Sequence, residues 1–227
     1  MPREHRLTRI GLLACRAAII QSFIVLPLAV LIASPLVIAA PVEQMVPVLS
    51  HVWEANAKGS VDYVHITFDR RADAAGLAIH FKTTPGRFSR SAKTSIEEAI
   101  RYTARALNLS PDSWTVVFSV PYPDITISGE SLSGMVGLSV AAMATGRTID
   151  SGLLLTGLIT PEGHIGPVGT APLRIPAPGR ARLRRVLVSR EQIVAERDQP
   201  ARDLMPITPI ATVTHAFQEL TGNPSKP

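Results

Sequence analysis

One loop in this sequence has residue types suited to nucleophilic chemistry. Residues 128–134 read Ser-Gly-Glu-Ser-Leu-Ser-Gly, and the small or apolar residues 135–144 follow directly. This order is typical of a flexible loop that leads into a closely packed helix. A serine at such a junction can place its Oγ beside the N–H groups of the helix start, which favour a negatively charged oxygen. The loop is therefore a candidate site for a serine nucleophile.

A second segment predicts a tight hairpin. Residues 156–169 read Thr-Gly-Leu-Ile-Thr-Pro-Glu-Gly-His-Ile-Gly-Pro-Val-Gly. Two short β-prone pieces flank the turn Thr160-Pro161-Glu162-Gly163, which has proline at its second position and glycine at its fourth.

Together the two segments resemble the proteolytic domain of the Lon-type serine peptidases. That family carries an Asp-Gly-Pro-Ser-Ala-Gly motif around its nucleophile, then a Thr-Gly-Glu-Ile-Thr segment and a catalytic lysine. Without a gap, the family serine falls on Ser131, its threonine on Thr156 and its lysine on Arg174. Further matches, over roughly residues 60–222, lie at Val120-Pro121 and at residues 95–99, 109–112, 185–188 and 205–207. The resemblance implies an α+β fold with Ser131 as nucleophile and with Thr156 and Gly157 shaping the site.

Arginine at position 174 departs from the chemistry of a Ser–Lys dyad. The lysine amine takes the serine proton and must first be neutral, which burial achieves by lowering its pKa of about 10.4. The guanidinium of Arg174, with a pKa above about 12, cannot act as this base. Pro176 and Pro178 also disrupt the helix that the family has here. Beside the nucleophile, Glu130 places a carboxylate where the family has proline.

Other groups offer few substitutes for the missing base. The lysines of the chain are Lys58, Lys82, Lys93 and Lys226, none in a segment that the resemblance brings to Ser131. His164, after the hairpin turn, is the spare candidate for a Ser–His pair, and a solvated turn histidine is its alternative. For Ser131 the alternative role is that of a helix N-cap.

The elements that would position these residues follow from periodicity and turn signals. Residues 61–68 and 76–81 predict a β-hairpin on which His65 and His80 could face each other. Thr94-Ser95-Ile96-Glu97 predicts a capping box at a helix start. Further strands are expected at 114–120, 152–156 and 186–188, and a closing helix at 212–220 that stops at Gly222.

The N-terminal region predicts a membrane segment. Residues 17–42 carry no charge, and about twenty apolar residues suffice to span a bilayer core. Arginines before this segment and Glu43 after it favour a cytoplasmic N-terminus and an extracytoplasmic, periplasmic domain. A cleaved signal peptide, which would release a secreted protein, is the alternative. The expected division is a basic flank (1–16), a transmembrane anchor or signal peptide (17–42), a linker (43–59), the Lon-like domain (60–222) and a tail (223–227).

Composition excludes several classes of function. Most of the formal net charge of +5 comes from arginines before the apolar segment, so the basic balance does not indicate a nucleic-acid partner. Cys15 is the single cysteine, which leaves no disulfide framework and no thiol nucleophile in the domain. The sequence has no Gly-X-X-X-X-Gly-Lys-Ser/Thr motif, and we expect neither ATP, a metal nor another cofactor.

These observations predict a membrane-anchored, ATP-independent Lon-like serine endopeptidase domain with arginine in place of the catalytic lysine. The alternative is a catalytically dead pseudopeptidase that binds peptides or proteins, and a purely structural domain is a third reading. The expected partner is a polypeptide substrate or peptide ligand. Assembly into homo-oligomers stays open.

Overall fold

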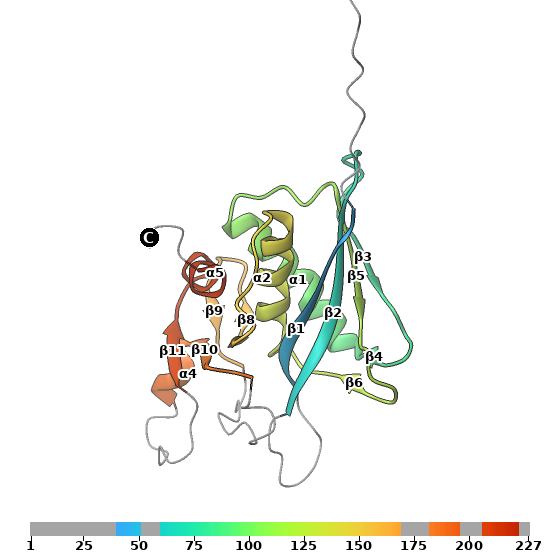
Figure 1. The fold of residues 1–227 in the computed structure, drawn as a ribbon. Helices are drawn as coiled ribbons and strands as arrows, with labels where there is room; N and C mark the ends of the chain where they lie inside the picture. Colours follow the sequence, from blue (N-terminus) through green and yellow to red (C-terminus); the bar gives the residue numbers. More distant parts are fainter. Residues whose placement is uncertain (1–39, 51–59, 169–181, 196–205, 223–227) are drawn as a thin grey trace, which may run out of the picture. The chain divides into compact units, whose positions relative to one another are not determined.

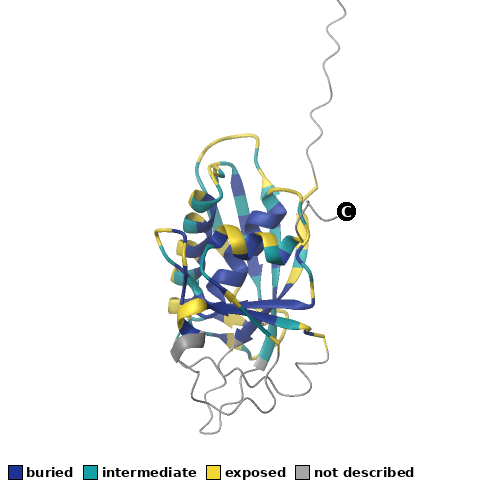
Figure 2. Ribbon diagram, turned by 90° about the vertical axis from the view of Figure 1, so that its left-hand side faces the viewer, coloured by how far each residue is buried: buried dark blue, intermediate teal, exposed yellow. Residues whose placement is uncertain are grey.

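The computed structural model describes residues 40–50, 60–168, 182–195 and 206–222, all within one of the two units of the chain, residues 38–227. These residues form a four-stranded sheet, a three-stranded sheet, two short strand pairs and several helices (Figure 1). Buried residues run through the middle of this unit, whereas exposed residues follow the loops and outer helix turns (Figure 2).

The four-stranded sheet has the order β1-β2-β5-β3. Its strands are β1 (Val42–Ser50), β2 (Ser60–Arg70), β5 (Trp114–Ser119) and β3 (Ala78–Phe81). Alternate residues of β2 and β5, such as Ile66 and Phe118, are fully buried, and the residues between them are half-buried. The predicted strands at 61–68 and 114–120 are confirmed, because a period of two places one face of each strand in the core.

Strand β1 corrects the predicted linker at residues 43–59. It pairs antiparallel with β2 along its whole length, from Val42 opposite Phe68 to Ser50 opposite Ser60. Val46 and Val48 enter the core. The rest of the predicted linker, residues 51–59, lies outside the described residues.

Strand β3 corrects the predicted hairpin between residues 61–68 and 76–81. β2 pairs antiparallel with β5, and β3 pairs parallel with the opposite edge of β5. His65 therefore lies opposite Ser119, whereas His80 lies opposite Val117 on the other side of β5. The two histidines do not face each other, and the described residues contain no cluster of ligands that could hold a metal ion.

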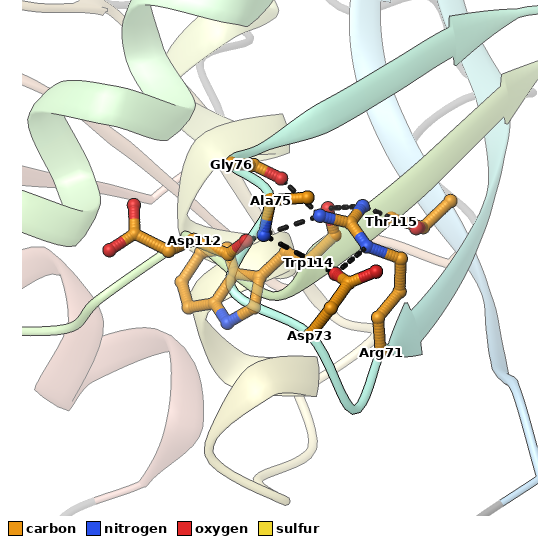
Figure 3. Close-up of polar contacts among 7 residues, drawn as sticks. All are labelled: Arg71, Asp73, Ala75, Gly76, Asp112, Trp114 and Thr115. Atoms are coloured by element: carbon orange, nitrogen blue, oxygen red, sulfur yellow. Dashed lines mark hydrogen bonds and ion pairs between the residues drawn. The ribbon is translucent and has the colours of Figure 1, made fainter.

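Arg71 hydrogen-bonds the connection between β2 and β3 to the start of β5. The guanidinium of Arg71 donates to the carbonyl oxygens of Gly76, Asp112 and Trp114, to Thr115 Oγ1 and to the Asp73 carboxylate (Figure 3). The hydrogen bonds from Arg71 and from the Ala75 N–H keep the pKa of Asp73 below its ordinary value. Because these acceptors lie on both the loop and β5, Arg71 directs residues 71–77 across the sheet.

Two helices pack against the buried face of this sheet. α1 (Arg90–Ala106) begins after Ser89, whose Oγ accepts a hydrogen bond from the Ala92 N–H. The predicted capping box at residues 94–97 is therefore wrong, since those residues lie inside the helix. α2 (Ser133–Ala144) is buried on all sides, and it contacts α1, β1 and β2.

Most of the remaining elements form a second, parallel sheet and its surroundings, and one short strand pair lies beside the four-stranded sheet (Figure 1). They are β7 (Leu153–Thr156), β10 (Arg185–Ser189), β11 (Ile207–Ile210), α4 (Arg190–Ala195), α5 (Val213–Thr221), the hairpin β8 (Leu158–Ile159) with β9 (Ile165–Gly166), and the pair β4 (Arg87–Phe88) with β6 (Thr126–Ile127). The predicted strands at 152–156 and 186–188 and the predicted hairpin are confirmed. The closing helix is confirmed too, with Thr212 as its N-cap and Gly222 as its C-cap.

The predicted fold class, α+β with a transmembrane helix in front, is wrong. Parallel and antiparallel pairings are mixed and helices alternate with strands, so the described chain is a mixed α/β fold. None of the helices in the described ranges has the length and apolar content that a bilayer crossing needs. The predicted segment 17–42 lies almost wholly outside these ranges, and its last residue, Val42, begins β1.

We expect Arg71→Met to lower the free energy of unfolding by about 2 kcal/mol or more, because several part-buried carbonyl groups lose a charged donor. Urea unfolding followed by circular dichroism measures this change. The control is Arg101→Met, at an exposed position of α1 for which no side-chain hydrogen bond to the described residues is found. This control should stay within about 0.5 kcal/mol. Equal stabilities of the two variants would contradict the role given to Arg71.

Candidate functional site

The serine loop, residues 128–132, lies at the start of the buried helix α2, as predicted. The N-cap residue of α2 is Leu132, and its side chain makes no capping hydrogen bond. Ser131 comes directly before it and is not the N-cap. The alternative role of Ser131 as a capping residue is therefore wrong.

The hydroxyl of Ser131 is enclosed by the protein. Ser131 is 5% exposed, and its Oγ donates a hydrogen bond to the backbone carbonyl of Leu49 at 3.2 Å. Leu49 lies near the end of β1, so the contact joins segments far apart in the sequence. A backbone carbonyl accepts this hydrogen bond but does not take up the proton at neutral pH.

Main-chain hydrogen bonds connect the serine loop to the junction between β7 and β8. The Gly157 N–H donates to the carbonyl of Ser131 at 3.3 Å, and the Gly134 N–H donates to the carbonyl of Gly157 at 3.0 Å. A Cβ atom at position 134 would lie 2.5 Å from the Gly157 carbonyl oxygen, and one at position 157 would lie 2.6 Å from Ile165 Cγ2. Glycine at position 134 therefore permits the close approach of α2 to this junction, and glycine at position 157 permits the close approach of the junction to β9.

Thr156 reaches the site as the last residue of β7. It is fully buried, and its Oγ1 has no hydrogen-bond partner among the described residues. A buried hydroxyl without a partner costs about 1–3 kcal/mol. The structure thus places Ser131 beside Gly157, which follows Thr156 in the chain.

Two of the helix-start N–H groups are already used. The Ser133 N–H donates to the carbonyl of Glu130 at 3.0 Å, and the Gly134 N–H donates to Gly157. The backbone N–H groups of Ser131 and Leu132 have no acceptor among the described residues. Glu130, whose carbonyl accepts one of these hydrogen bonds, is an exposed residue.

The predicted base position cannot be placed. Arg174, Pro176 and Pro178 lie outside the described residues, so the role of this segment stays a prediction. Lys93 lies on α1, with its Nζ 5.5 Å from the centre of the Phe81 ring. Lys82, the other described lysine, is exposed beyond the end of β3.

His164 is not part of the described site. It is exposed, its N–H donates to Thr160 Oγ1 at 3.3 Å, and it forms an isolated β-bridge with Thr212. Thr160 and His164 lie at the turn end of the β8–β9 hairpin, whereas Gly157 precedes its other end. None of the described contacts of His164 is with the serine loop.

Sequence reasoning missed Leu49 as a partner of Ser131. The apolar residues Val46, Val48 and Leu49 could have indicated a strand. Pro41 and Pro47 instead favoured a linker, because proline is usually excluded from sheet interiors. Pro47 is compatible with β1 because β1 is an edge strand of its sheet.

Comparison with known proteins identifies similarity to Lon proteases. No family model matches the chain. A protein named Lon protease 2, from Desulfotalea psychrophila, is 32% identical over 124 residues, which cover 53% of this chain and 16% of that protein. A Lon protease from Chloroflexus aurantiacus is 27% identical over 124 residues, which cover 52% of this chain and 15% of that protein. This weak homology over about half of the chain supports a Lon-related domain, although the matched part is a small share of each relative.

We expect Gly134→Ala to destabilise the protein by about 1–3 kcal/mol, because the new methyl group would overlap the Gly157 carbonyl. Urea unfolding provides the measurement. The control is Ser139→Ala in the same helix, which creates the same residue without such an overlap and should cost no more than about 1 kcal/mol. A Gly134→Ala variant as stable as the native protein would show that this close approach is not required.

Proposed function

We propose that the chain carries a Lon-like serine endopeptidase domain that cleaves extended polypeptides, with Ser131 as its nucleophile. Similarity to two Lon proteases supports the class. The observation that carries the proposal is the pair of main-chain hydrogen bonds that join Gly157, directly after Thr156, to Ser131 of the serine loop and to Gly134 of α2. Residues 131 and 157 are distant in the sequence, and their proximity supports a site at the start of α2.

In the proposed reaction, a base takes the proton of Ser131 Oγ as the Oγ attacks a peptide carbonyl. The protonated base then gives this proton to the nitrogen of the breaking C–N bond, so that the amine leaves and an acyl-enzyme remains. The developing oxyanion would be bound by the N–H groups of Ser131 and Leu132, since those of Ser133 and Gly134 already have acceptors. The buried Thr156 Oγ1 is available to orient the group that receives the serine proton. Water, deprotonated by the same base, then attacks the ester; the bond to Ser131 Oγ breaks, the carboxylic acid leaves and the proton returns to Oγ.

The proposed reaction needs a base that accepts the proton of Ser131. Arg174 occupies the position of the family lysine in the sequence, and a guanidinium can stabilise an oxyanion or orient a carboxylate. It cannot remove the serine proton at neutral pH. The proposal therefore requires a base other than Arg174.

A pseudopeptidase that binds peptides without cleaving them is the second candidate. The observation that favours it is the hydrogen bond from Ser131 Oγ to the Leu49 carbonyl, which directs the hydroxyl to a group that is not a base. Arginine at position 174 points in the same direction. In this case the site would keep its shape for an extended peptide without the proton transfer.

Incubation of the purified protein with unfolded casein and a fluorogenic peptide mixture tests these alternatives. If the chain is a peptidase, Ser131→Ala should lower cleavage by at least about 10³-fold, because the nucleophile is lost. The matched control Ser139→Ala removes a buried hydroxyl of α2 outside the serine loop and should cleave normally. Cleavage that persists in Ser131→Ala would exclude Ser131 as nucleophile.

The variant Arg174→Lys tests whether a lysine at this position is sufficient to restore peptide cleavage. We expect it to raise peptide cleavage above the native level, because a lysine amine can be deprotonated at reachable cost. Cleavage by Arg174→Lys alone would indicate a pseudopeptidase disabled at one position. Binding of peptide without cleavage by either form would support the binding module.

A further inference from the structure

The end of strand β1 covers the proposed nucleophile. The Leu49 carbonyl accepts a hydrogen bond from the Ser131 hydroxyl. Both residues are nearly inaccessible to solvent, since Leu49 is 2% exposed and Ser131 is 5% exposed. A substrate carbonyl must approach a serine Oγ to about 3 Å before attack. In the described arrangement the Oγ is buried and its proton is engaged, so the serine is withheld from a substrate.

The side chain of Leu49 fixes this contact from the other side. Leu49 belongs to a small apolar cluster with Leu154, Leu183, Val186 and Val188, which is separate from the main core. Leu154 lies on β7 and the two valines lie on β10. The backbone of Leu49 thus belongs to one sheet, while its side chain is packed against residues of the other.

The end of β1 lies at the edge of its sheet. β1 is an edge strand, and β2 is its one neighbour among the described strands. Pro47, two residues before Leu49, has no N–H to donate within the ladder. The last pairs of the ladder are Leu49 with Val61 and Ser50 with Ser60, at the end where residues 51–59 connect β1 to β2.

We propose that the end of β1 is an autoinhibitory latch, in which the Leu49 side chain holds the Leu49 carbonyl over the Ser131 hydroxyl. Withdrawal of Leu49 from its apolar cluster frees the hydroxyl and opens the approach to it. Opening leaves β2, β5 and α2 in place, since only the last residues of an edge strand move. The regulatory consequence of the latch rests on the proposed function, whereas its structural part does not.

Thiol labelling tests the latch without any need for catalysis. In the full-length chain, Ser131→Cys is combined with Cys15→Ser, so that the thiol at position 131 is the single one. Iodoacetamide is the probe, and intact mass reports the rate of labelling under native conditions. Leu49→Ala is then added to weaken the apolar anchor, and Val48→Ala is the matched control, because its side chain enters the main core from the opposite face of β1.

We expect Leu49→Ala to raise the labelling rate about tenfold or more, because the buried anchor of the closed latch is removed. Val48→Ala should change the rate by less than about twofold, although it also removes buried methyl groups. Equal labelling rates in the Leu49→Ala, Val48→Ala and parent proteins would overturn the latch. Rapid labelling of the parent protein itself would overturn it as well.

If Ser131→Cys does not fold, amide hydrogen exchange of the Ser131→Ala variant tests the latch. In an otherwise native chain, Ser131→Ala removes the hydrogen bond to Leu49. Amides of residues 48–50 should then exchange roughly 2- to 12-fold faster, which is the range expected for loss of one neutral hydrogen bond. Ser139→Ala should leave them unchanged. Unchanged exchange in Ser131→Ala would contradict the latch.

Casein cleavage by Leu49→Ala, with Ser131 intact, separates this proposal from the peptidase proposal. Faster labelling together with faster cleavage supports both. Faster labelling without any cleavage supports the latch and overturns the peptidase. Cleavage by the native protein with no effect of Leu49→Ala on labelling supports the peptidase and overturns the latch.

Discussion

The complete burial of helix α2 is the constraint on which the rest of the described structure depends. A helix that is apolar on every face must be covered on every face, and α2 is enclosed by α1, α5, β1, β2, β7 and β8. Gly134 and Gly137 permit two of these contacts, because a Cβ atom would overlap Gly157 at the first position and Thr103 at the second. The position of the serine loop is a consequence of this packing, since the loop is the entry to the helix.

Local sequence signals predicted the elements whose periodicity or caps lie within their own residues. β2 and β5 alternate with a period of two, and α5 has both of its caps in the sequence. The pairing of strands was not predictable in the same way. β3 pairs with β5, and Arg71, which precedes β3, binds carbonyl groups on residues distant in the sequence. The start of α1 was misplaced because two capping signals follow one another, at Ser89 and at residues 94–97, and the earlier one is used.

The candidate site was predicted in part. The motifs predicted a site with Ser131, Thr156 and Gly157, and a main-chain hydrogen bond joins Ser131 to Gly157. The Leu49 carbonyl could not be predicted, because any residue type supplies a carbonyl and only the fold decides where it lies. The same holds for the helix-start N–H groups, two of which are taken up by Glu130 and Gly157. Backbone groups carry no signature in a sequence, so the polar surroundings of a nucleophile are the part that needs a structure.

Because Ser131 is hydrogen-bonded to Leu49, the presence of this serine does not by itself indicate an active enzyme. Replacement by alanine would leave a buried carbonyl with one donor fewer, so the hydroxyl has a structural use that is independent of any reaction. A chain that had lost its base would still lose stability on losing this serine. In proteins with this arrangement, the residue at the base position is the informative marker of activity, and the serine alone is not.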